Sequence, residues 1–218
     1  VRNVDTIILA VKPQGFDIVL NEIKGGIERK LIISIAAGIT TGYIEKRLSE
    51  AAVVRAMPNM PARIGKGVTC LSRGRFATEE HLGFSKELFS SLGETLVLGE
   101  QMMNAATAIS GSGPAYVYDV DYNNISESKK KDFRLFFEEA ARLIGFGNEQ
   151  ARMLADATIS GAVAMLKVTN ETPSQLKKQI TSKGGTTEAA LEILHKGGSL
   201  KEAVRAALKR AEELSREE

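Results

Sequence analysis

Strand-like and helix-like segments alternate through the first half of the sequence, and this alternation is the feature that most limits how the chain can fold. Apolar, β-branched runs such as TIILAV at residues 6–11 and KLIISIAAG at 30–38 are typical of strands covered on both faces. Further strands are predicted at residues 53–56, 67–72 and 94–99, with helices between them. Strands and helices joined by short links predict an α/β parallel sheet of partial Rossmann type.

The second half, from about Glu100, has no strand pattern. Helical periods follow one another, separated by Gly, Pro or capping residues. The Ala-rich stretch at residues 151–165 allows helices to approach closely, as in a packed bundle. We therefore expect two domains, a partial dinucleotide-binding domain at residues 1–99 and an all-α helical domain at residues 100–218.

Composition and charge exclude several classes of protein. Hydrophobic residues make up 43% of the 218 and charged residues 26%, which predicts an ordinary soluble chain. The formal net charge is only +2 and basic residues are mixed with acidic ones, which argues against nucleic acid as the main partner. No apolar run reaches the ~20 residues of a membrane helix. A single cysteine, Cys70, fits a reducing compartment, so a cytoplasmic location is expected.

The residues that follow the predicted strands mark the edge of the sheet where a ligand is expected. In open α/β sheets, ligands bind beyond the carboxyl ends of the strands. Lys12 and Pro13 follow the first strand, and small residues end the second. The third strand leads into Pro58 and Asn59. These positions are candidates for contact with a cofactor.

The stretch QITSKGGTTEAALEILHK, at residues 179–196, places two glycines and two threonines directly before an amphipathic helical run. A helix start offers free backbone N–H groups and the positive end of the helix dipole, which together bind anions. Gly184 and Gly185 let that backbone approach a ligand closely. A plain capping motif, with Glu188 in the first turn, explains the same residues equally simply.

Five blocks in this order carry a resemblance to a known family: AVKPQ, SIAAGI, VRAMPNMPARIGKGVT, AISGSGPAYVY and PSQLKKQITSKGGTTEAALEIL. Together they closely resemble the pyrroline-5-carboxylate reductase family, which makes L-proline by reducing a cyclic imine with NADPH or NADH. The last block is the most specific of the five. The resemblance covers nearly the whole chain except roughly residues 119–132, and it implies a homodimer or larger homo-oligomer formed through the helical domain.

The resemblance implies where the substrate binds. The substrate carboxylate is expected on the backbone N–H groups around Gly185, Thr186 and Thr187, assisted by Ser182, with Gly184 allowing the close approach. The Thr187 hydroxyl is implied as hydrogen-bond partner or proton donor to the ring nitrogen. The cofactor carries the difficult step of such a reaction, so few acid–base side chains are needed.

Glu100 is implied as a partner of the charged nitrogen, because it aligns with a family position near proline. An acid that favours the dipole of a helix N-terminus is an equally good interpretation. Asn170 and Glu171 are weaker candidates of the same kind. His81 and His195 are expected to be structural, with no metal-ligand spacing around them.

The resemblance also implies the contacts of the nicotinamide cofactor. Small side chains would let the ring lie against the backbone, and prolines would shape the wall. The expected residues are Val11, Lys12, Pro13, Ala36, Ala37, Pro58, Asn59 and Gln179. Some of these residues can also be explained without a cofactor. Lys12 would then be a solvated residue at the end of a strand, and Pro58 would restrict the conformation of a loop.

The sequence departs from the family pattern at its start. The family begins with a Gly-rich strand–turn–helix that holds the pyrophosphate, and the present sequence opens with Val1 and enters a strand at once. The GSGP at residues 111–114 does not follow a strand in a βαβ unit, so it does not serve instead. We therefore expect a fragment that binds dinucleotide weakly, and no preference between NADPH and NADH can be assigned.

The second departure is DVDYNNISESKKKD at residues 119–132. This polar segment makes the path to Gly145 roughly four helical turns longer than the family pattern, at about 3.6 residues per turn. Its Asn, Ser and Lys content predicts a solvated loop or a frayed helix. The segment interrupts the helix that the family uses for dimerisation, which leaves subunit pairing open.

Two other functions compete with the reductase. One is a non-catalytic helical oligomerisation module derived from the family, which needs no pyrophosphate site. The other is a different enzyme of the wider 6-phosphogluconate-dehydrogenase-like group. That group usually relies on a lysine within its long helix, and residues 100–118 contain none.

Overall fold

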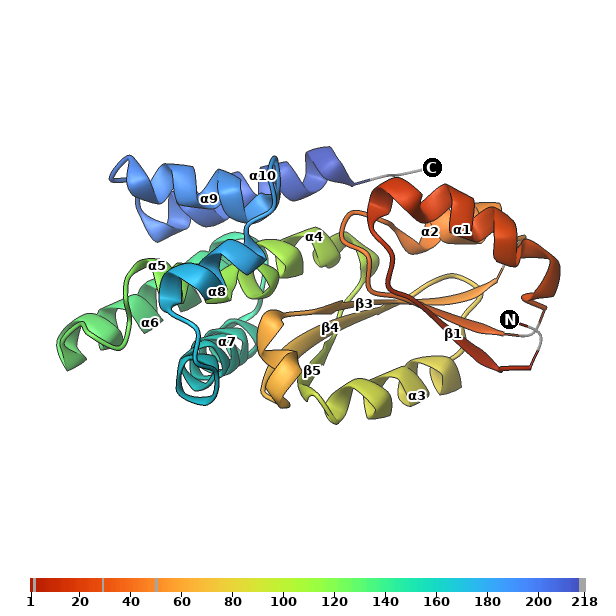
Figure 1. Cartoon of the computed structure of the whole chain (residues 1–218), viewed down its shortest axis with the longest axis horizontal. Helices are drawn as coiled ribbons and strands as arrows, with labels where there is room; N and C mark the ends of the chain where they lie inside the picture. The colour runs from red at the N-terminus through yellow and green to blue at the C-terminus, as the bar shows by residue number, and fades with distance from the viewer. Residues whose placement is uncertain (2, 29, 50, 216–218) are drawn as a thin grey trace.

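The computed structural model describes residues 1, 3–28, 30–49 and 51–215. A sheet flanked by helices occupies one end of the elongated molecule, and a group of helices occupies the other (Figure 1). The last two helices, drawn in blue, run back above the helical half, and the end of the last one lies near the sheet half. None of the described helices is long and apolar enough to cross a membrane.

Within the described residues, five strands form one sheet in the order β1-β2-β3-β4-β5. Their bounds are Thr6–Leu9, Leu31–Ser34, Ala52–Pro58, Gly67–Arg73 and Gly93–Val97. The predicted parallel arrangement is confirmed for the pairs β1–β2, β2–β3 and β4–β5, whereas β3 and β4 pair antiparallel. The link between β3 and β4 holds only the short 3₁₀ helix Met60–Ile64, and a parallel crossover needs a dozen or more residues.

Helices cover both faces of the sheet, as the alternation predicts. The helices α1 (Phe16–Ile23) and α2 (Thr41–Arg47) lie on one face, and α3 (Glu79–Ser90) lies on the other (Figure 1). Alternate residues of the strands therefore enter two different cores. Ile32 packs with α1 and α2, and Ile33 packs on the side of α3.

Strand β1 is less buried than its sequence predicts. TIILAV was expected to be covered on both faces, yet Ile8 is 50% exposed, while Leu9 is buried. The reason is position, because β1 is the edge strand among the described strands and pairs only with β2. An apolar run alone does not distinguish an edge strand from a central one.

The helical half begins with the 3₁₀ turn Glu100–Met102 and continues through a nearly unbroken helix. This helix consists of α4 (Met103–Ala106), a π-helical turn at Thr107–Gly111, and α5 (Gly113–Asp119). The remaining helices are α6 (Glu127–Leu143), α7 (Asn148–Val168), α8 (Pro173–Ile180), α9 (Thr186–His195) and α10 (Leu200–Leu214).

The sequence explains where these helices start. Thr172 and Ser199 form capping boxes with the Gln and the Glu three residues later, which satisfy the free amides of α8 and α10. Gly185, which starts α9, has no side chain with which to cap the helix. The first-turn amides of α9 thus have no side-chain acceptor from their own cap residue.

The polar segment 119–132 is a tight turn followed by an ordered helix start, rather than a long loop. Asp119 ends α5, and Ser126 caps α6, so the three lysines lie in the first turns of that helix. Tyr122 in the turn meets Phe133 edge-on, with ring centroids 5.6 Å apart. The turn sends the chain back so that α6 packs against α7 and α10.

Asp119 also connects α5 to two later helices. Its carboxylate accepts hydrogen bonds from Lys177 Nζ at 2.7 Å on α8 and contacts His195 Nε2 at 3.0 Å on α9. Burial tends to raise the pKa of this carboxyl group, but the contacts with Lys177 and His195 dominate and hold it below its ordinary value of 3.8. The ionised form of Asp119 therefore stabilises the packing of α5, α8 and α9.

Several contacts join the halves of the molecule, and two of them bear on the position of the helices. Arg55 of β3 donates from Nη1 to Glu100 Oε1 at 2.7 Å, at the start of the helical half. Gly38, which has a φ of +73°, lies so close to Leu214 at the end of α10 that an added Cβ would stand 2.8 Å from the Leu214 carbonyl oxygen. The C-terminal helix thus reaches the carboxyl end of β2.

We expect Asp119→Asn to lower the free energy of unfolding by about 1–3 kcal/mol at neutral pH, because it removes a largely buried charged hydrogen-bond acceptor. The pKa of Asp119 is lowered in the fold, so its contribution is complete above 3.8 and is lost as the pH falls through the lowered value. Urea unfolding of both proteins should therefore converge in acid. The exposed Asp132→Asn is the control, and an equal loss there would contradict the assignment.

Gly38→Ala should destabilise the fold and loosen the end of α10. A positive φ costs a non-Gly residue about 1–2 kcal/mol, and the new methyl group would also press on the backbone of Leu214. Gly25→Ala is the matched control, since Gly25 has a φ of −80° and open space around it. Thermal unfolding should separate the two variants, and equal melting temperatures would show that α10 does not depend on this contact.

Candidate active site

A cavity of about 470 Å³ lies where the carboxyl ends of β1 and β2 meet the helical half. Its walls come from parts of the chain that are far apart in sequence. They are the ends of β1 and β2, the start of the long helix at α4, the loop between α8 and α9, and the end of α10. This volume is typical of a site for a small molecule.

Three of the expected cofactor residues line this cavity, namely Lys12, Pro13 and Ala37. Val11 is directly before Lys12 and half-buried, and Ala36 is buried behind Ala37. The side chains at this end of the sheet are small, so the backbone itself forms much of the wall. This part of the site agrees with the rule that ligands bind beyond the carboxyl ends of the strands.

The structure does not place Pro58, Asn59 and Gln179 on the cavity. Asn59 is buried, and its Oδ1 accepts from Val68 N at 2.8 Å while its Nδ2 donates to Ser110 O at 3.3 Å. It therefore joins the β3–β4 link to the long helix. Pro58 and Asn59 were predicted from their place after a strand, but β3 pairs with its antiparallel partner β4 up to Pro58.

Gln179 lies on α8 and does not line the cavity. Its Oε1 accepts from Arg63 Nη1 at 2.9 Å, and its Nε2 donates to Glu171. Glu171 and the neighbouring Asn170, the two weaker candidates, are in the link before α8 and do not line the cavity either. Gln179 thus connects α8 to Arg63 in the β3–β4 link and to Glu171.

Glu100 is likewise absent from the cavity wall. Its Oε1 pairs with Arg55, and its Oε2 accepts from Thr41 Oγ1 at 3.3 Å. Because Arg55 is 1% exposed, this carboxylate already neutralises a buried charge. A role of Glu100 toward a substrate nitrogen stays a prediction.

The loop Ser182–Gly185 and Thr186 form the wall opposite the sheet. Gly184 has a φ of +70°, and an added Cβ at Gly185 would lie 2.2 Å from Ser182 Oγ and 3.0 Å from Ser182 O, so this turn favours glycine. Two of the backbone amides in the predicted anion site already have acceptors within the protein. Gly184 N donates to Glu188 Oε2 at 2.6 Å, and Gly185 N donates to Ser182 O at 3.0 Å. The amides of the first turn of α9 are therefore the ones available to bind an anion.

Thr187 lies behind the wall rather than on it. Its side chain is 3% exposed, and its Oγ1 donates to Ser112 Oγ at 3.0 Å. Ser112 Oγ also lies 3.0 Å from Thr186 Oγ1, and Thr186 does line the cavity. A row of three hydroxyl groups therefore leads from the buried Thr187 to the cavity.

The cavity is electrostatically suited to an anion. Lys12 and Lys183 lie on its wall, and no Asp or Glu is among the described residues that line it. Arg210 of α10 donates from Nε to Gly184 O at 2.7 Å and so holds the loop in place. The Glu188 carboxylate, in the first turn of α9, accepts from Gly184 N.

Sequence reasoning missed several residues of the wall. They are Gln14, Asn104, Thr107, Lys183, Ala211 and Leu214. Lys183 lies inside the glycine-containing block. The sequence does not distinguish it from the lysines that are common on protein surfaces. Thr107 is in the π-helical turn, a feature often found at functional sites. No residue pattern in the sequence predicts such a turn. Ala211 and Leu214 enter only through tertiary packing of α10.

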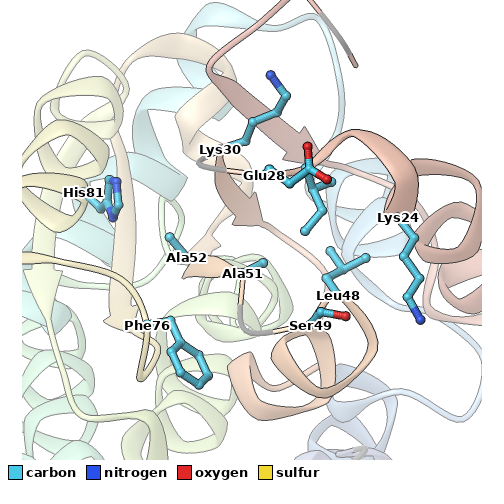
Figure 2. A pocket seen from close by; sticks show the side chains of 10 residues that line it. Lys24, Glu28, Lys30, Leu48, Ser49, Ala51, Ala52, Phe76 and His81 are labelled. Carbon is cyan, nitrogen blue, oxygen red and sulfur yellow. The ribbon is translucent and has the colours of Figure 1, made fainter.

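A second cavity, of about 570 Å³, lies at the amino ends of β2 and β3, which is the opposite edge of the sheet (Figure 2). Lys24 and Lys30 are on its rim, and in Figure 2 their side chains extend away from each other. The ammonium group of Lys30 donates to the Val4 carbonyl group instead. His81, across the cavity, uses Nδ1 to accept from Thr78 N in the cap of α3. The charged groups do not converge, so we do not assign this cavity a ligand.

Other titratable groups near the long helix are committed to the fold. Burial raises the pKa of the Cys70 thiol to about 12, despite its contact with Ser110. Burial also raises the pKa of Tyr116, whose hydroxyl group donates to Ala108 O at 2.9 Å. Among the described residues, no group of three or more His, Cys, Asp or Glu side chains is placed to hold a metal ion.

Comparison with known families identifies both halves of the chain. A sequence model described as pyrroline-5-carboxylate reductase dimerisation matches residues 134–217. A second, described as NADP oxidoreductase, coenzyme F420-dependent, matches residues 1–38. The dimerisation match starts directly after the polar segment 119–132.

Individual proteins agree with this result. The pyrroline-5-carboxylate reductase of Synechocystis sp. is 38% identical to the chain, over 97% of the chain and 76% of the relative. The enzyme of the same name from Arabidopsis thaliana is 36% identical, over 99% of the chain and 75% of the relative. The crystal structure of Plasmodium falciparum pyrroline carboxylate reductase with NADP bound is similar, with a TM-score of 0.61 and 33% identity over 99% of the chain and 78% of that structure.

The chain thus spans about three quarters of the length of these relatives. A cavity at the carboxyl ends of parallel strands, closed by a Gly-Gly-Thr-Thr helix start, accompanies sequence identity of more than a third over nearly the whole chain. On these grounds the chain belongs to the pyrroline-5-carboxylate reductase family.

Proposed function

We propose that this chain reduces 1-pyrroline-5-carboxylate to L-proline with NAD(P)H, the final step of proline biosynthesis, and that the 470 Å³ cavity is where it does so. One observation carries the proposal: the carboxyl ends of β1 and β2 and the loop before α9 line the same cavity. A non-catalytic oligomerisation module would not need these distant segments to converge. The division into a dinucleotide-binding domain at 1–99 and a helical domain at 100–218 follows from the same reading.

The substrate carboxylate binds at the start of α9. The amides of Thr186 and Thr187 lie in its first turn, at the positive end of the helix dipole. Lys12 and Lys183 add positive charge on the cavity wall. Ser182, Gly184 and Gly185 shape the turn so that the carboxylate reaches this backbone.

The residues at the ends of β1 and β2 fit the nicotinamide end of the cofactor. Ala37 and Gly38 leave the backbone accessible from the cavity, and Lys12 and Pro13 flank them. Val11 and Ala36 support this wall from behind. When bound, NAD(P)H supplies the hydride for the imine carbon. The protein holds the substrate ring against this wall and keeps water away from it.

A hydroxyl group at the start of α9 serves the ring nitrogen. The family resemblance assigns this role to Thr187, which is held beside Ser112 and Thr186. As hydride reaches the carbon, negative charge develops on the nitrogen, so a hydrogen bond to it strengthens in the transition state. Glu100 supports the site from a distance by fixing the start of the long helix.

The chain forms a homodimer through its helical half, in a cytoplasmic setting. The family's dimerisation region spans residues 134–217, and α6 within it carries exposed apolar side chains. Leu135 is 43% exposed, Phe136 53% and Leu143 40%. These three side chains on one helix form an apolar surface that a second copy would cover.

An assay of NADPH and NADH oxidation, each in excess, should show turnover that depends on 1-pyrroline-5-carboxylate. Lys183→Gln should raise KM for this substrate about two- to fivefold and leave kcat unchanged, because an exposed charge contributes equally to substrate and transition-state binding. Lys178→Gln, an exposed lysine on α8 away from the cavity, should change neither constant. Absence of turnover with both cofactors would contradict the proposed reaction.

Size-exclusion chromatography with light scattering should give a particle of two 23.5 kDa chains or a multiple of it. Phe136→Glu should shift this particle toward the monomer, because it places a charge within the apolar surface of α6. Phe84→Glu on α3, where the wild-type ring is 48% exposed, should leave the mass unchanged. A wild-type monomer at all concentrations would exclude the proposed dimer.

A further inference from the structure

The turn before α9 is held differently from the starts of the neighbouring helices. In α10, Glu202 accepts from the amide of its own cap residue, Ser199, at 2.7 Å, and the glutamine at the equivalent place in α8 does the same. Glu188 has this place in α9, but it accepts from Gly184 N at 2.6 Å, one residue before the cap Gly185. The carboxylate therefore holds the turn, and Gly185 has no side chain to occupy the amides of the first helical turn.

The carbonyl group of the same glycine is bound from α10. Arg210 donates from Nε to Gly184 O at 2.7 Å, and from Nη1 to Glu213 Oε2 at 2.9 Å, which fixes the orientation of its guanidinium group. A Cβ added to Gly184 would lie 3.6 Å from Arg210 Nη2, so the guanidinium group lies beside this residue. Both polar backbone groups of Gly184 are thus bound by charged side chains, one from α9 and one from α10.

Gly184 is the residue of this turn that most needs such support. Its φ of +70° lies in the region that favours glycine, and glycine keeps more backbone freedom than any other residue. Ser182 and Lys183 before it are exposed, and the hydrogen bond from Gly185 N to Ser182 O uses neither polar group of Gly184. Hydrogen bonds to charged groups are stronger than neutral ones, so the contacts with Glu188 and Arg210 restrict this turn.

We propose that Arg210 and Glu188 are positioning residues for substrate binding. By holding the carbonyl group and the amide of Gly184 from two helices, they fix the turn that presents the first-turn amides of α9 to the substrate carboxylate. Neither residue lines the cavity, so both act through the backbone of Gly184. This inference rests on the proposed function, and it assigns parts to two residues that the sequence does not single out.

Two neutral variants of Glu188 separate positioning from charge. The Glu188 carboxylate lies beside the proposed anion site, so removing its charge alone favours an anionic substrate. Glu188→Gln keeps an acceptor oxygen for Gly184 N and removes the charge, whereas Glu188→Ala removes both. The difference between these two variants therefore reports the hydrogen bond to Gly184.

Steady-state kinetics of the full chain test the proposal. Glu188→Ala should have a KM for 1-pyrroline-5-carboxylate about five- to twentyfold above that of Glu188→Gln, with similar kcat, because the carboxylate contact contributes equally to substrate and transition-state binding. Arg210→Lys keeps the charge but loses the planar fork of donors, and should raise KM about three- to tenfold. Equal KM values for the two Glu188 variants, or a loss confined to kcat, would overturn the assignment.

Glu192→Ala and Arg205→Ala are the matched controls, because both side chains are exposed on the same two helices. They should keep the wild-type KM and kcat. The double variant of Glu188→Ala with Arg210→Lys should raise KM by less than the product of the two single effects, since both changes release the same glycine. Effects that multiply, or a rise in KM in the controls equal to that in the test variants, would contradict the proposal.

A measurement without substrate separates this inference from the proposed function. Hydrogen exchange at the Gly184 amide, followed by NMR in the ligand-free protein, should be about tenfold faster in Glu188→Ala than in Glu188→Gln. Arg210→Lys should also accelerate it, and Glu192→Ala should not. If wild type shows no turnover but this pattern is present, the proposed reaction fails and the positioning of Gly184 stands. If the amide exchanges equally in the two Glu188 variants, the inference is wrong whatever the activity.

Discussion

The ion pair between Arg55 and Glu100 sets how the two halves of the molecule fit together. Arg55 is in the middle of β3 with its side chain 1% exposed, and its guanidinium group carries a positive charge into the interior. A buried charge without a partner costs about 3–5 kcal/mol, so the carboxylate of Glu100 is held at this point of the sheet. Thr41 of α2 bonds the other oxygen of Glu100. The long helix therefore starts at a fixed place and in a fixed direction.

The consequences of this anchor extend to the cavity. Asn104 and Thr107 lie within two turns of Glu100 and form part of the cavity wall. The other walls depend on α10, whose end approaches Gly38 at the carboxyl end of β2. The site is thus assembled by contacts between distant segments of one chain. Its most specific part, the turn at Gly184 and Gly185, is local, but the position of that turn is not.

The sequence predicts the fold class well because the spacing of hydrophobic residues indicates a strand or a helix from neighbouring positions alone. TIILAV and KLIISIAAG contain β1 and β2 as expected. Pairing direction is not local, so the antiparallel contact of β3 with β4 was not predicted. The same limit explains why β1 was expected to be fully covered. For residues 119–132 the sequence predicted a solvated loop or a frayed helix, and the structure has a short turn followed by a helix that Ser126 caps.

The site was predictable where one block of sequence carries it. Ser182, Gly184, Gly185 and Thr186 line the cavity together with Lys12, Pro13 and Ala37, because loops at strand ends and helix starts expose their backbone. Side chains that look available in the sequence were otherwise engaged by neighbours, as with Asn59, Gln179 and Glu100. Sequence patterns do not reveal which polar group will be satisfied by a segment a hundred residues away.

The π-helical turn Thr107–Gly111 has a geometric consequence for how this chain can vary in length. One extra residue in a helix advances the following side chains by about 100° around the axis. Removing one residue from the turn would restore the ordinary α spacing and rotate α5 relative to α4 by that angle. The anchor at Glu100 and the hydroxyl contact of Ser112 with α9 could not both survive the rotation. The irregular turn sets the rotation of α5 relative to α4. Insertions and deletions should therefore be tolerated in the outer loops but not in this turn.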